Sequence, residues 1–272
     1  MQKCIRVFPR RTKWTPIDDL AFVGDPPLFR PPDMPVKISV TFTWDIKEGE
    51  RLQKAWSVYY SDVQLGGVAF GDSGNGFTPG QFIKEGVTFT SRGCNKRCPW
   101  CFVPEREGKI RELEIKDGYI VQDNNLLACS DNHIDKVFAM LRRQKRGIVF
   151  SGGLDATLLK SWHVGLLKTI SVKEMWFACD TDQSIPNLEK ISELLKDFSL
   201  NSKRCYVLIG YTNNMLLDQI RLKKVLDLGF LPFAQLYQPK TLYKREYPKK
   251  WRDMARFWSR PAIYKTELKK SS

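Results

Sequence analysis

The sequence predicts an α/β protein built as an open, partial (β/α) barrel behind a small N-terminal βαβ unit. Between residues 86 and 236, five apolar strand-like segments alternate with segments that have helical apolar spacing. Such alternation indicates a parallel sheet that is buried on both faces. Glycine and polar residues follow each apolar segment, at the strand end where barrel-type α/β folds keep their sites. Five or at most six strands are too few for a closed barrel, so an open one is expected.

The length of 272 residues allows one large α/β domain fused to a smaller one. We expect residues 1–80 to hold a proline-rich arm and a truncated Rossmann-like βαβ unit. Residues 81–240 are expected to form the partial barrel. Residues 241–272 are expected to form a basic, aromatic C-terminal helix or tail.

The N-terminal part is expected to begin irregularly and then to become regular. Prolines recur through residues 1–35, which predicts an arm that lies on the surface of the domain. Residues 36–44 are rich in β-branched and aromatic side chains and predict a strand. Asp45 with Glu48 resembles a capping box, which predicts a helix, and residues 62–67 predict a second strand. Together these segments make a βαβ unit.

The barrel elements follow in order. Strands are expected at residues 86–90, 147–150, 175–178, 206–209 and 230–236, with helices between most of them. The long connection 105–132 predicts a β-hairpin in which residues 112–115 pair with residues 119–121 around Asp117 and Gly118. A helix is expected at residues 133–143.

Three cysteines, Cys94, Cys98 and Cys101, lie within eight residues of one predicted loop. Thiolate is a soft ligand that suits iron–sulfur clusters and zinc, and three thiolates leave one corner of a 4Fe–4S cluster open. A zinc site with His133 or Cys129 as a fourth ligand is the alternative, as are buried packing and a disulfide. The odd total of seven cysteines fits a reducing compartment better than a disulfide framework.

The spacing CxxxCxxC, with Trp100 just before the third cysteine, resembles the radical S-adenosylmethionine (SAM) superfamily. The flanking residues Thr90-Ser91-Arg92-Gly93 and Phe102-Val103-Pro104 resemble its branch with a cobalamin-binding-type N-terminal domain and the methylthiotransferases. The resemblance implies that Cys94, Cys98 and Cys101 hold a 4Fe–4S cluster whose open iron binds SAM. It also implies reductive cleavage of SAM to a 5′-deoxyadenosyl radical, with electrons from a partner such as flavodoxin or ferredoxin. The chain has no Asp-x-His-x-x-Gly motif, so no cobalamin is expected.

The family resemblance also assigns expected cofactor contacts at the strand ends. A Gly-Gly pair in this family contacts the methionyl amine of SAM, which points to Gly152 and Gly153 after Ser151. The family often has an acid in third place, where this chain has Leu154, with Asp155 one residue later. Further candidate cofactor contacts are Trp100, Ser151, Asp155, Asp180, Asp182, Gly210 and Tyr211.

Several of these positions have a second interpretation. Asp180 and Asp182 suit a ribose hydroxyl or the methionyl amine, but Thr181 or Asp182 can instead cap the next helix. Cys179 is either a radical relay or a buried, inert thiol. Tyr237 is a candidate on the substrate side, together with Asn124, Asn125 and Gln235.

The charge is strongly basic, with 44 Lys and Arg against 30 Asp and Glu, a net +14. From Lys240 to Ser272, eleven basic and three acidic residues are interleaved with aromatic ones. This pattern suits phosphate contacts with base stacking, or an amphipathic helix whose aromatics pack on the domain. The chain has no apolar run of membrane-spanning length and no signal segment, so no membrane association and a cytoplasmic location are expected.

The sequence thus predicts a radical SAM enzyme acting on an anionic substrate, a nucleic acid or a nucleotide-like molecule. A radical activase or maturase of a protein partner is the alternative within enzymes. A non-catalytic iron–sulfur or zinc protein that binds nucleic acid is the alternative of another class. No second cysteine set is visible for an accessory cluster, which argues against sulfur insertion.

Overall fold

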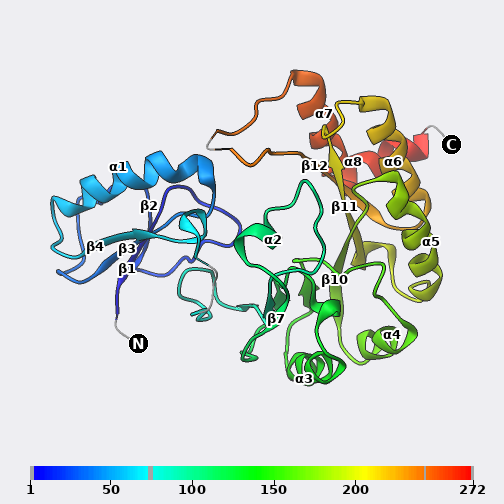
Figure 1. The fold of residues 1–272 in the computed structure, drawn as a ribbon, viewed down its shortest axis with the longest axis horizontal. Coiled ribbons are helices and arrows are strands. Elements are labelled where there is room, and N and C mark those ends of the chain that lie inside the picture. The colour runs from blue at the N-terminus through cyan, green and yellow to red at the C-terminus, as the bar shows by residue number, and fades with distance from the viewer. Residues whose placement is uncertain (1–2, 73–75, 242, 271–272) are drawn as a thin grey trace. The chain divides into compact units, whose positions relative to one another are not determined.

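The computed structural model describes residues 3–72, 76–241 and 243–270. The chain divides into two compact units (Figure 1). The N-terminal unit comprises Met1–Val87 with Glu105–Glu107 and Lys240–Lys244. The C-terminal unit comprises Thr88–Pro104, Gly108–Pro239 and Arg245–Ser272.

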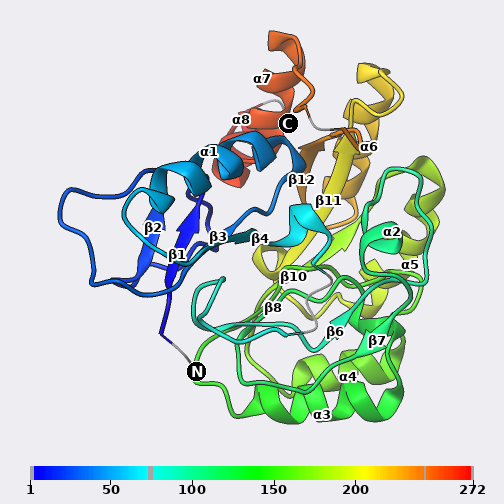
Figure 2. The same ribbon diagram turned by 60° about the vertical axis from the view of Figure 1, so that its left-hand side comes forward.

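The N-terminal unit is a four-stranded parallel sheet in the order β2-β1-β3-β4. Its elements are β1 (Ile5–Phe8), β2 (Ala21–Val23), β3 (Val36–Ser39), α1 (Ile46–Ser57) and β4 (Val63–Gly66). Helix α1 lies along one side of this sheet (Figures 1 and 2), where Leu52 and Trp56 are fully buried. The predicted βαβ unit is therefore present as β3, α1 and β4.

The prediction of an irregular surface arm is wrong for its first residues. Strand β1 is an inner strand of the sheet, and Ile5 and Val7 are fully buried. Each of the three strands within residues 1–39 is only three or four residues long, and the prolines fall in the connections between them. Strands this short leave no periodic pattern, and they are stabilised by pairing with distant segments.

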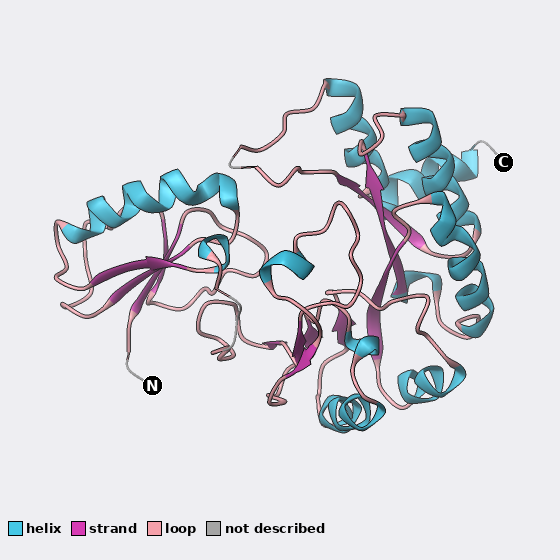
Figure 3. Cartoon of the chain, viewed as in Figure 1, coloured by secondary structure: helices cyan, strands magenta, loops and turns pink. Residues whose placement is uncertain are grey.

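The C-terminal unit is built on a six-stranded parallel sheet in the order β12-β11-β10-β9-β8-β5. Its strands are β5 (Val87–Thr88), β8 (Ile120–Val121), β9 (Ile148–Phe150), β10 (Val172–Ala178), β11 (Lys203–Ile209) and β12 (Leu231–Leu236). Its main helices are α3 (Asp131–Arg142), α4 (Ser161–Lys168), α5 (Ile185–Leu194), α6 (Met215–Asp227), α7 (Lys249–Trp258) and α8 (Pro261–Lys270). Helices α3 to α6 lie along one side of the sheet (Figures 1 and 3).

Short elements complete the chain. They are the strands β6 (Ser91–Arg92) and β7 (Arg111–Glu112), the helix α2 (Val103–Arg106), and the 3-10 helices η1 (Thr43–Asp45), η2 (Val68–Phe70), η3 (Leu126–Ala128), η4 (Asp182–Ser184) and η5 (Leu200–Ser202). The main core lies between the sheet and its helices and includes Phe138, Phe150, Met175, Phe177 and Phe230. Burial of such side chains is the chief stabilising contribution to the unit.

The predicted hairpin between residues 112 and 121 is wrong. Strand β7 pairs antiparallel with β6, so that Ser91 lies opposite Glu112. Strand β8 instead joins the main sheet, parallel to β9. The apolar residues Ile120 and Val121 are buried there against β9, which a local hairpin on the surface would not achieve.

The aromatic residues of the C-terminal tail pack into the domain. Tyr247, Trp251, Trp258 and Tyr264 are all buried members of the main core. Lys250, Arg252 and Arg256 of α7 are exposed. The amphipathic interpretation is therefore confirmed for α7, and base stacking on these four rings is excluded because they are covered.

Among the residues that the structure describes, no helix is both long enough and apolar enough to cross a membrane.

Candidate cofactor site

The cysteine loop follows β6 directly and is shaped by its backbone. Gly93 has a φ of +82°, and a Cβ there would lie 2.1 Å from the carbonyl oxygen of Lys109, so only glycine fits. The amide of Cys94 donates to the carbonyl of Gly108 at 3.1 Å, and that of Cys101 donates to Cys98 at 3.0 Å. These contacts fold the loop back on itself.

The three thiols of the loop are half-buried, and Cys98 lies within electrostatic range of the other two. Burial raises the pKa of the Cys98 thiol. Its acidic neighbours Cys101, Asp180 and Cys94 raise that pKa further, while Lys96 opposes the rise. A bound metal would reverse this balance, because a coordinating thiol is deprotonated outright. The loop therefore needs cations near it to hold three thiolates together.

The described residues contain no group of three or more His, Cys, Asp or Glu side chains that could hold a single metal ion. His133, one of the two candidates for a fourth zinc ligand, is engaged elsewhere. The Nε2 atom of His133 lies 2.9 Å from the carbonyl oxygen of Thr90. Burial raises the pKa of Cys129 to about 11. A 4Fe–4S cluster would take each of the three thiolates on a different iron.

A buried carboxylate holds the strand that leads into the loop. Asp123 is 1% exposed and accepts hydrogen bonds from the Thr90 amide at 2.7 Å and the Ser91 hydroxyl at 2.8 Å. The Thr90 hydroxyl donates to it as well. Burial raises the pKa of Asp123, and these donors oppose the rise. The entry to the cysteine loop is thus fixed from within the sheet.

Asp155 is tied to the cysteine loop through two side chains. Its Oδ1 atom accepts from Lys96 Nζ at 2.7 Å, and its Oδ2 atom accepts from Asn125 Nδ2 at 3.2 Å. The same amide of Asn125 lies 3.8 Å from the sulfur of Cys94. Burial acts to raise the pKa of Asp155, but the hydrogen bonds from Lys96 and Thr157 outweigh it and the pKa is lowered. A charged Asp155 therefore links the strand end to the cysteine loop.

Asn125 leaves one polar atom without a partner. The side chain is buried, with 4% of its surface exposed, and its Oδ1 atom has no hydrogen-bond partner in the described protein. An unsatisfied buried acceptor next to thiols and a carboxylate is expected where a bound group completes the site. The donor set and this orphan atom fit a cluster with a second ligand.

The glycine pair follows β9 at the same edge of the sheet. A Cβ on Gly152 would lie 2.1 Å from the carbonyl oxygen of Asp123, so the two backbones touch there. Gly153 has a φ of +112° and open space beside it. Ser151 accepts a hydrogen bond from Gln122 through its hydroxyl and from Tyr206 through its carbonyl. Gly152 is therefore required for packing, and Gly153 leaves a place open.

We expect Gly152→Ala to weaken the cysteine loop. The new methyl group must push away the backbone of Asp123, whose carboxylate holds Thr90 and Ser91. The midpoint of thermal unfolding should fall, and less iron should be retained after anaerobic reconstitution. Gly165→Ala in α4 is the matched control, because nothing lies within 4 Å of a Cβ there. In a helix that change should be neutral or stabilising by up to about 1 kcal/mol. If both variants had the same unfolding midpoint and the same iron content, the close approach of Gly152 to the Asp123 backbone would have no role in holding the loop.

Asp180 connects the end of β10 to the cysteine loop. Its Oδ2 atom accepts from Trp100 Nε1 at 3.1 Å, and its Oδ1 atom accepts from the Leu208 amide at 3.2 Å. Burial raises the pKa of Asp180, and both donors oppose the rise. Trp100 is thus held against the sheet by the carboxylate that was expected to contact the cofactor.

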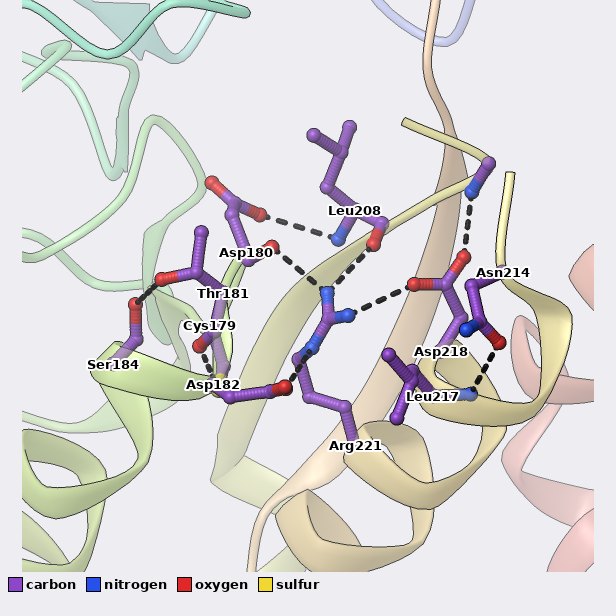
Figure 4. A network of polar contacts seen from close by, with 11 residues as sticks. Cys179, Asp180, Thr181, Asp182, Ser184, Leu208, Asn214, Leu217, Asp218 and Arg221 are labelled. Carbon is purple, nitrogen blue, oxygen red and sulfur yellow. Dashed lines mark hydrogen bonds and ion pairs between the residues drawn. The ribbon is translucent and has the colours of Figure 1, made fainter. Parts of the chain in front are cut away.

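Asp182, whose side chain is 58% exposed, belongs to a charge network that is centred on the buried Arg221 of α6 (Figure 4). Arg221 donates to Asp182 at 3.0 Å, to Asp218 at 2.8 Å and to the carbonyl of Asp180 at 2.8 Å. Asp218 in turn accepts from the Gly210 amide at 2.7 Å. The network joins the ends of β10 and β11 to α6, and Asp182 makes no side-chain cap of η4.

The expected space for adenine beside Gly210 is already filled. A Cβ on Gly210 would lie 2.8 Å from the ring of Tyr247, whose hydroxyl donates to the carbonyl of Tyr237 at 2.6 Å. Tyr211 is 40% exposed and meets the rings of Trp100 and Tyr237 edge-on, at centroid distances of 5.4 and 4.9 Å. The aromatic surface at this edge therefore consists of Trp100, Tyr211 and Tyr237.

Cys179 faces the main core and is fully buried. Burial raises its pKa to about 12. The structure therefore favours the inert thiol over the radical relay, because a buried neutral thiol in an apolar core is poorly reactive.

Sequence reasoning missed the groups that hold the site together. Asp123, Asp218, Arg221 and the pairing of Lys96 with Asp155 were not anticipated. One signal was available for two of them, because Asp218 and Arg221 are charged residues three positions apart in a helix with many apolar residues. The others depend on contacts between segments far apart in the chain.

No protein-family model matches this chain, and no curated protein matches it in sequence. Its function is therefore argued from the residues and from the geometry of the site.

Proposed function

We propose that this chain is a radical SAM enzyme. The observation that carries the proposal is the convergence of three side-chain links on one short loop. Lys96 reaches Asp155, Asn125 reaches both Cys94 and Asp155, and Trp100 reaches Asp180. The loop with three thiols is thereby joined to the ends of β9 and β10, at the sheet edge where such α/β folds bind ligands.

We also propose that the large sheet is a partial barrel. Its order from β5 to β12 follows the chain without reversal, whereas a doubly wound sheet reverses its direction. Helices α3 to α6 lie along one side only (Figure 3), as the outer helices of a barrel do. The inner face of such a barrel would be left for ligands.

The residues of the loop have separate tasks in this proposal. When bound by Cys94, Cys98 and Cys101, a 4Fe–4S cluster supplies the electron that breaks the sulfonium of SAM. Lys96 offsets the negative charge of the thiolates and of Asp155. Trp100 and Tyr211 cover this edge with aromatic surface, which limits the access of water. Gly153 and the free Oδ1 atom of Asn125 mark the side where the methionyl end is expected.

The proposed substrate is anionic, a nucleic acid or a nucleotide-like molecule. Support comes from the net charge of +14 and from the exposed basic residues of the cysteine loop and of α7. Because the rings of the tail are buried, we attribute the attraction to charge and not to stacking on the tail. The reduced thiols of the chain suit a reducing compartment such as the cytoplasm.

The proposed function is tested by anaerobic reconstitution with iron and sulfide, followed by dithionite and SAM. The products 5′-deoxyadenosine and methionine should form in equal amounts, as measured by chromatography with mass detection. A reconstituted brown protein that leaves SAM intact under these conditions would count against the proposal.

We expect Asn125→Leu to lower the reduction potential of the cluster. Hydrogen bonds to cluster sulfurs are among the contacts that set this potential, and the variant removes the amide near Cys94. The loss of Oδ1 removes no hydrogen bond, whereas the loss of the amide removes one donor to Asp155, which keeps those from Lys96 and Thr157. The midpoint potential is measured by redox titration followed by electron paramagnetic resonance (EPR). Asn187→Leu in α5 is the control and should leave the potential unchanged, and an unchanged potential in Asn125→Leu would contradict the assignment.

A further inference from the structure

Helix α6 carries an exposed apolar face at its N-terminal half. Leu216 is 67% exposed, Leu217 is 43% exposed and Ile220 is 55% exposed. Leu216 and Ile220 are four residues apart and therefore lie on the same side of the helix. We call Leu216, Leu217 and Ile220 the α6 patch.

The α6 patch is separate from the face by which α6 packs on its own domain. Leu222 and Val225 of the same helix are fully buried in the main core. The helix therefore has one apolar face in the core and a second one in solvent. Single exposed apolar side chains are common, but a group of them on one helix marks an interaction site.

The helix that carries the patch is firmly held. Asn214 caps it by accepting a hydrogen bond from the Leu217 amide at 3.2 Å (Figure 4). Arg221 and Asp218 anchor its next turns to β10 and β11. A patch on such a rigid element loses little conformational entropy when a partner binds.

The segment that leads into α6 contacts the cysteine loop through two rings. Tyr211, four residues before α6, is itself 40% exposed. Its ring meets that of Trp100 at a centroid distance of 5.4 Å, and Trp100 is next to Cys101 in the chain. Tyr211 therefore links the segment that leads into α6 to the residue beside a predicted cluster ligand.

The exposed charged residues nearest to the patch on α6 are Lys223 and, one turn further along, Asp227. Lys223 is exposed three residues after Ile220, on the same side of the helix. Arg245 lies beside Gly210, to whose carbonyl it donates at 3.4 Å. Lys96 and Arg97 of the cysteine loop are exposed as well. An apolar centre with basic residues around it is complementary to an acidic protein.

We propose that the α6 patch docks an acidic electron-donor protein that carries a flavin or an iron–sulfur cofactor. The proposal rests on the proposed function, which requires one electron from outside for each cleavage of SAM. The reduced donor loses that electron, and the cluster of this chain gains it. In this proposal the apolar side chains of the patch contact the donor protein, and the basic residues orient its acidic surface.

The test compares two sources of electrons in the full-length reconstituted protein. Leu216→Glu/Ile220→Glu places negative charge on the patch without disturbing the core. With reduced, acidic flavodoxin as donor, SAM cleavage should fall by about tenfold or more, and with dithionite it should be unchanged. Ile17→Glu/Leu28→Glu is the matched control, because these side chains are 82% and 81% exposed in the N-terminal unit. The control should keep full activity with both electron sources.

Direct binding of the same flavodoxin is measured by titration calorimetry and keeps the docking testable if no SAM is cleaved. Flavodoxin should bind the wild type and the control variant, should bind the patch variant at least about tenfold more weakly, and should lose affinity in high salt. Equal binding to all three proteins, or no binding to any, would overturn the proposal. So would a wild-type dimer that dissociates in the patch variant, because the patch would then be a contact between two copies. An equal loss of activity with flavodoxin and with dithionite would show damage to the cysteine loop and would also overturn it.

Discussion

Cys98→Ala protein, reconstituted anaerobically, should retain no intact 4Fe–4S cluster and should release no 5′-deoxyadenosine. Cys98 is the central thiol of the loop in sequence, and its amide-linked turn joins it to Cys101, whose amide donates to the Cys98 carbonyl at 3.0 Å. Two thiolates from one loop leave two irons of the cluster without a protein ligand. Iron and sulfide analysis, the visible absorption spectrum and the SAM cleavage assay together measure the loss.

Cys129→Ala is the control for this prediction. Cys129 is also half-buried and is the cysteine that would complete a four-ligand zinc site. Under the cluster assignment its removal should leave iron content and SAM cleavage near the wild-type values. If Cys129→Ala lost its metal as fully as Cys98→Ala, Cys129 would be a ligand and the assignment of three thiolates would be wrong.

Arg221→Leu should destabilise the C-terminal unit by about 3–5 kcal/mol, because it leaves the buried carboxylate of Asp218 without its partner. The side chain of Asp218 is only 2% exposed and that of Arg221 is 6% exposed. Burial already raises the pKa of Asp218, and Arg221 opposes the rise. The variant also removes two hydrogen bonds to backbone carbonyls, those of Asp180 and Leu208. The free energy of unfolding is measured by denaturant titration with tryptophan fluorescence.

Lys168→Ala provides the comparison within the same unit. Lys168 pairs with Asp197, and both side chains are more than half exposed. Solvent-exposed ion pairs contribute little to stability, so the unfolding curve should hardly move. If both variants lost a similar amount of unfolding free energy, the buried Arg221 network would stabilise the unit no more than an exposed ion pair does.

The local sequence pattern predicts that the large sheet is parallel, but it does not predict which short strands join the sheet. The apolar runs at residues 148–150, 175–178 and 206–209 suffice to predict parallel strands, because burial on both faces requires continuous apolar sequence. Strand β8 has only Ile120 and Val121, and its partner β9 is found only through the fold. Short strands of this kind are stabilised by non-local pairing, which a local pattern does not record.

In the candidate site, too, the sequence predicts the local motif but not the contacts between distant segments. The spacing of Cys94, Cys98 and Cys101 is visible in the sequence and was sufficient to locate the loop. The contacts that position the loop join residues 59 and 80 positions apart, as in Lys96 with Asp155 and Trp100 with Asp180. Nothing in the spacing of these residues predicts that they pair. At Gly210 the sequence-based expectation was wrong, because the space beside this glycine was expected to hold a ligand and instead holds the ring of Tyr247.

We propose that the cysteine loop binds a 4Fe–4S cluster with one iron open to SAM. The most direct test of this claim is the EPR spectrum of the reconstituted, dithionite-reduced protein, recorded with and without SAM and paired with metal analysis. We predict about four irons and four sulfides per chain. We also predict a signal of a reduced 4Fe–4S cluster that changes when SAM is added. A colourless protein that holds one zinc, or a cluster signal that SAM leaves unaltered, would contradict the claim.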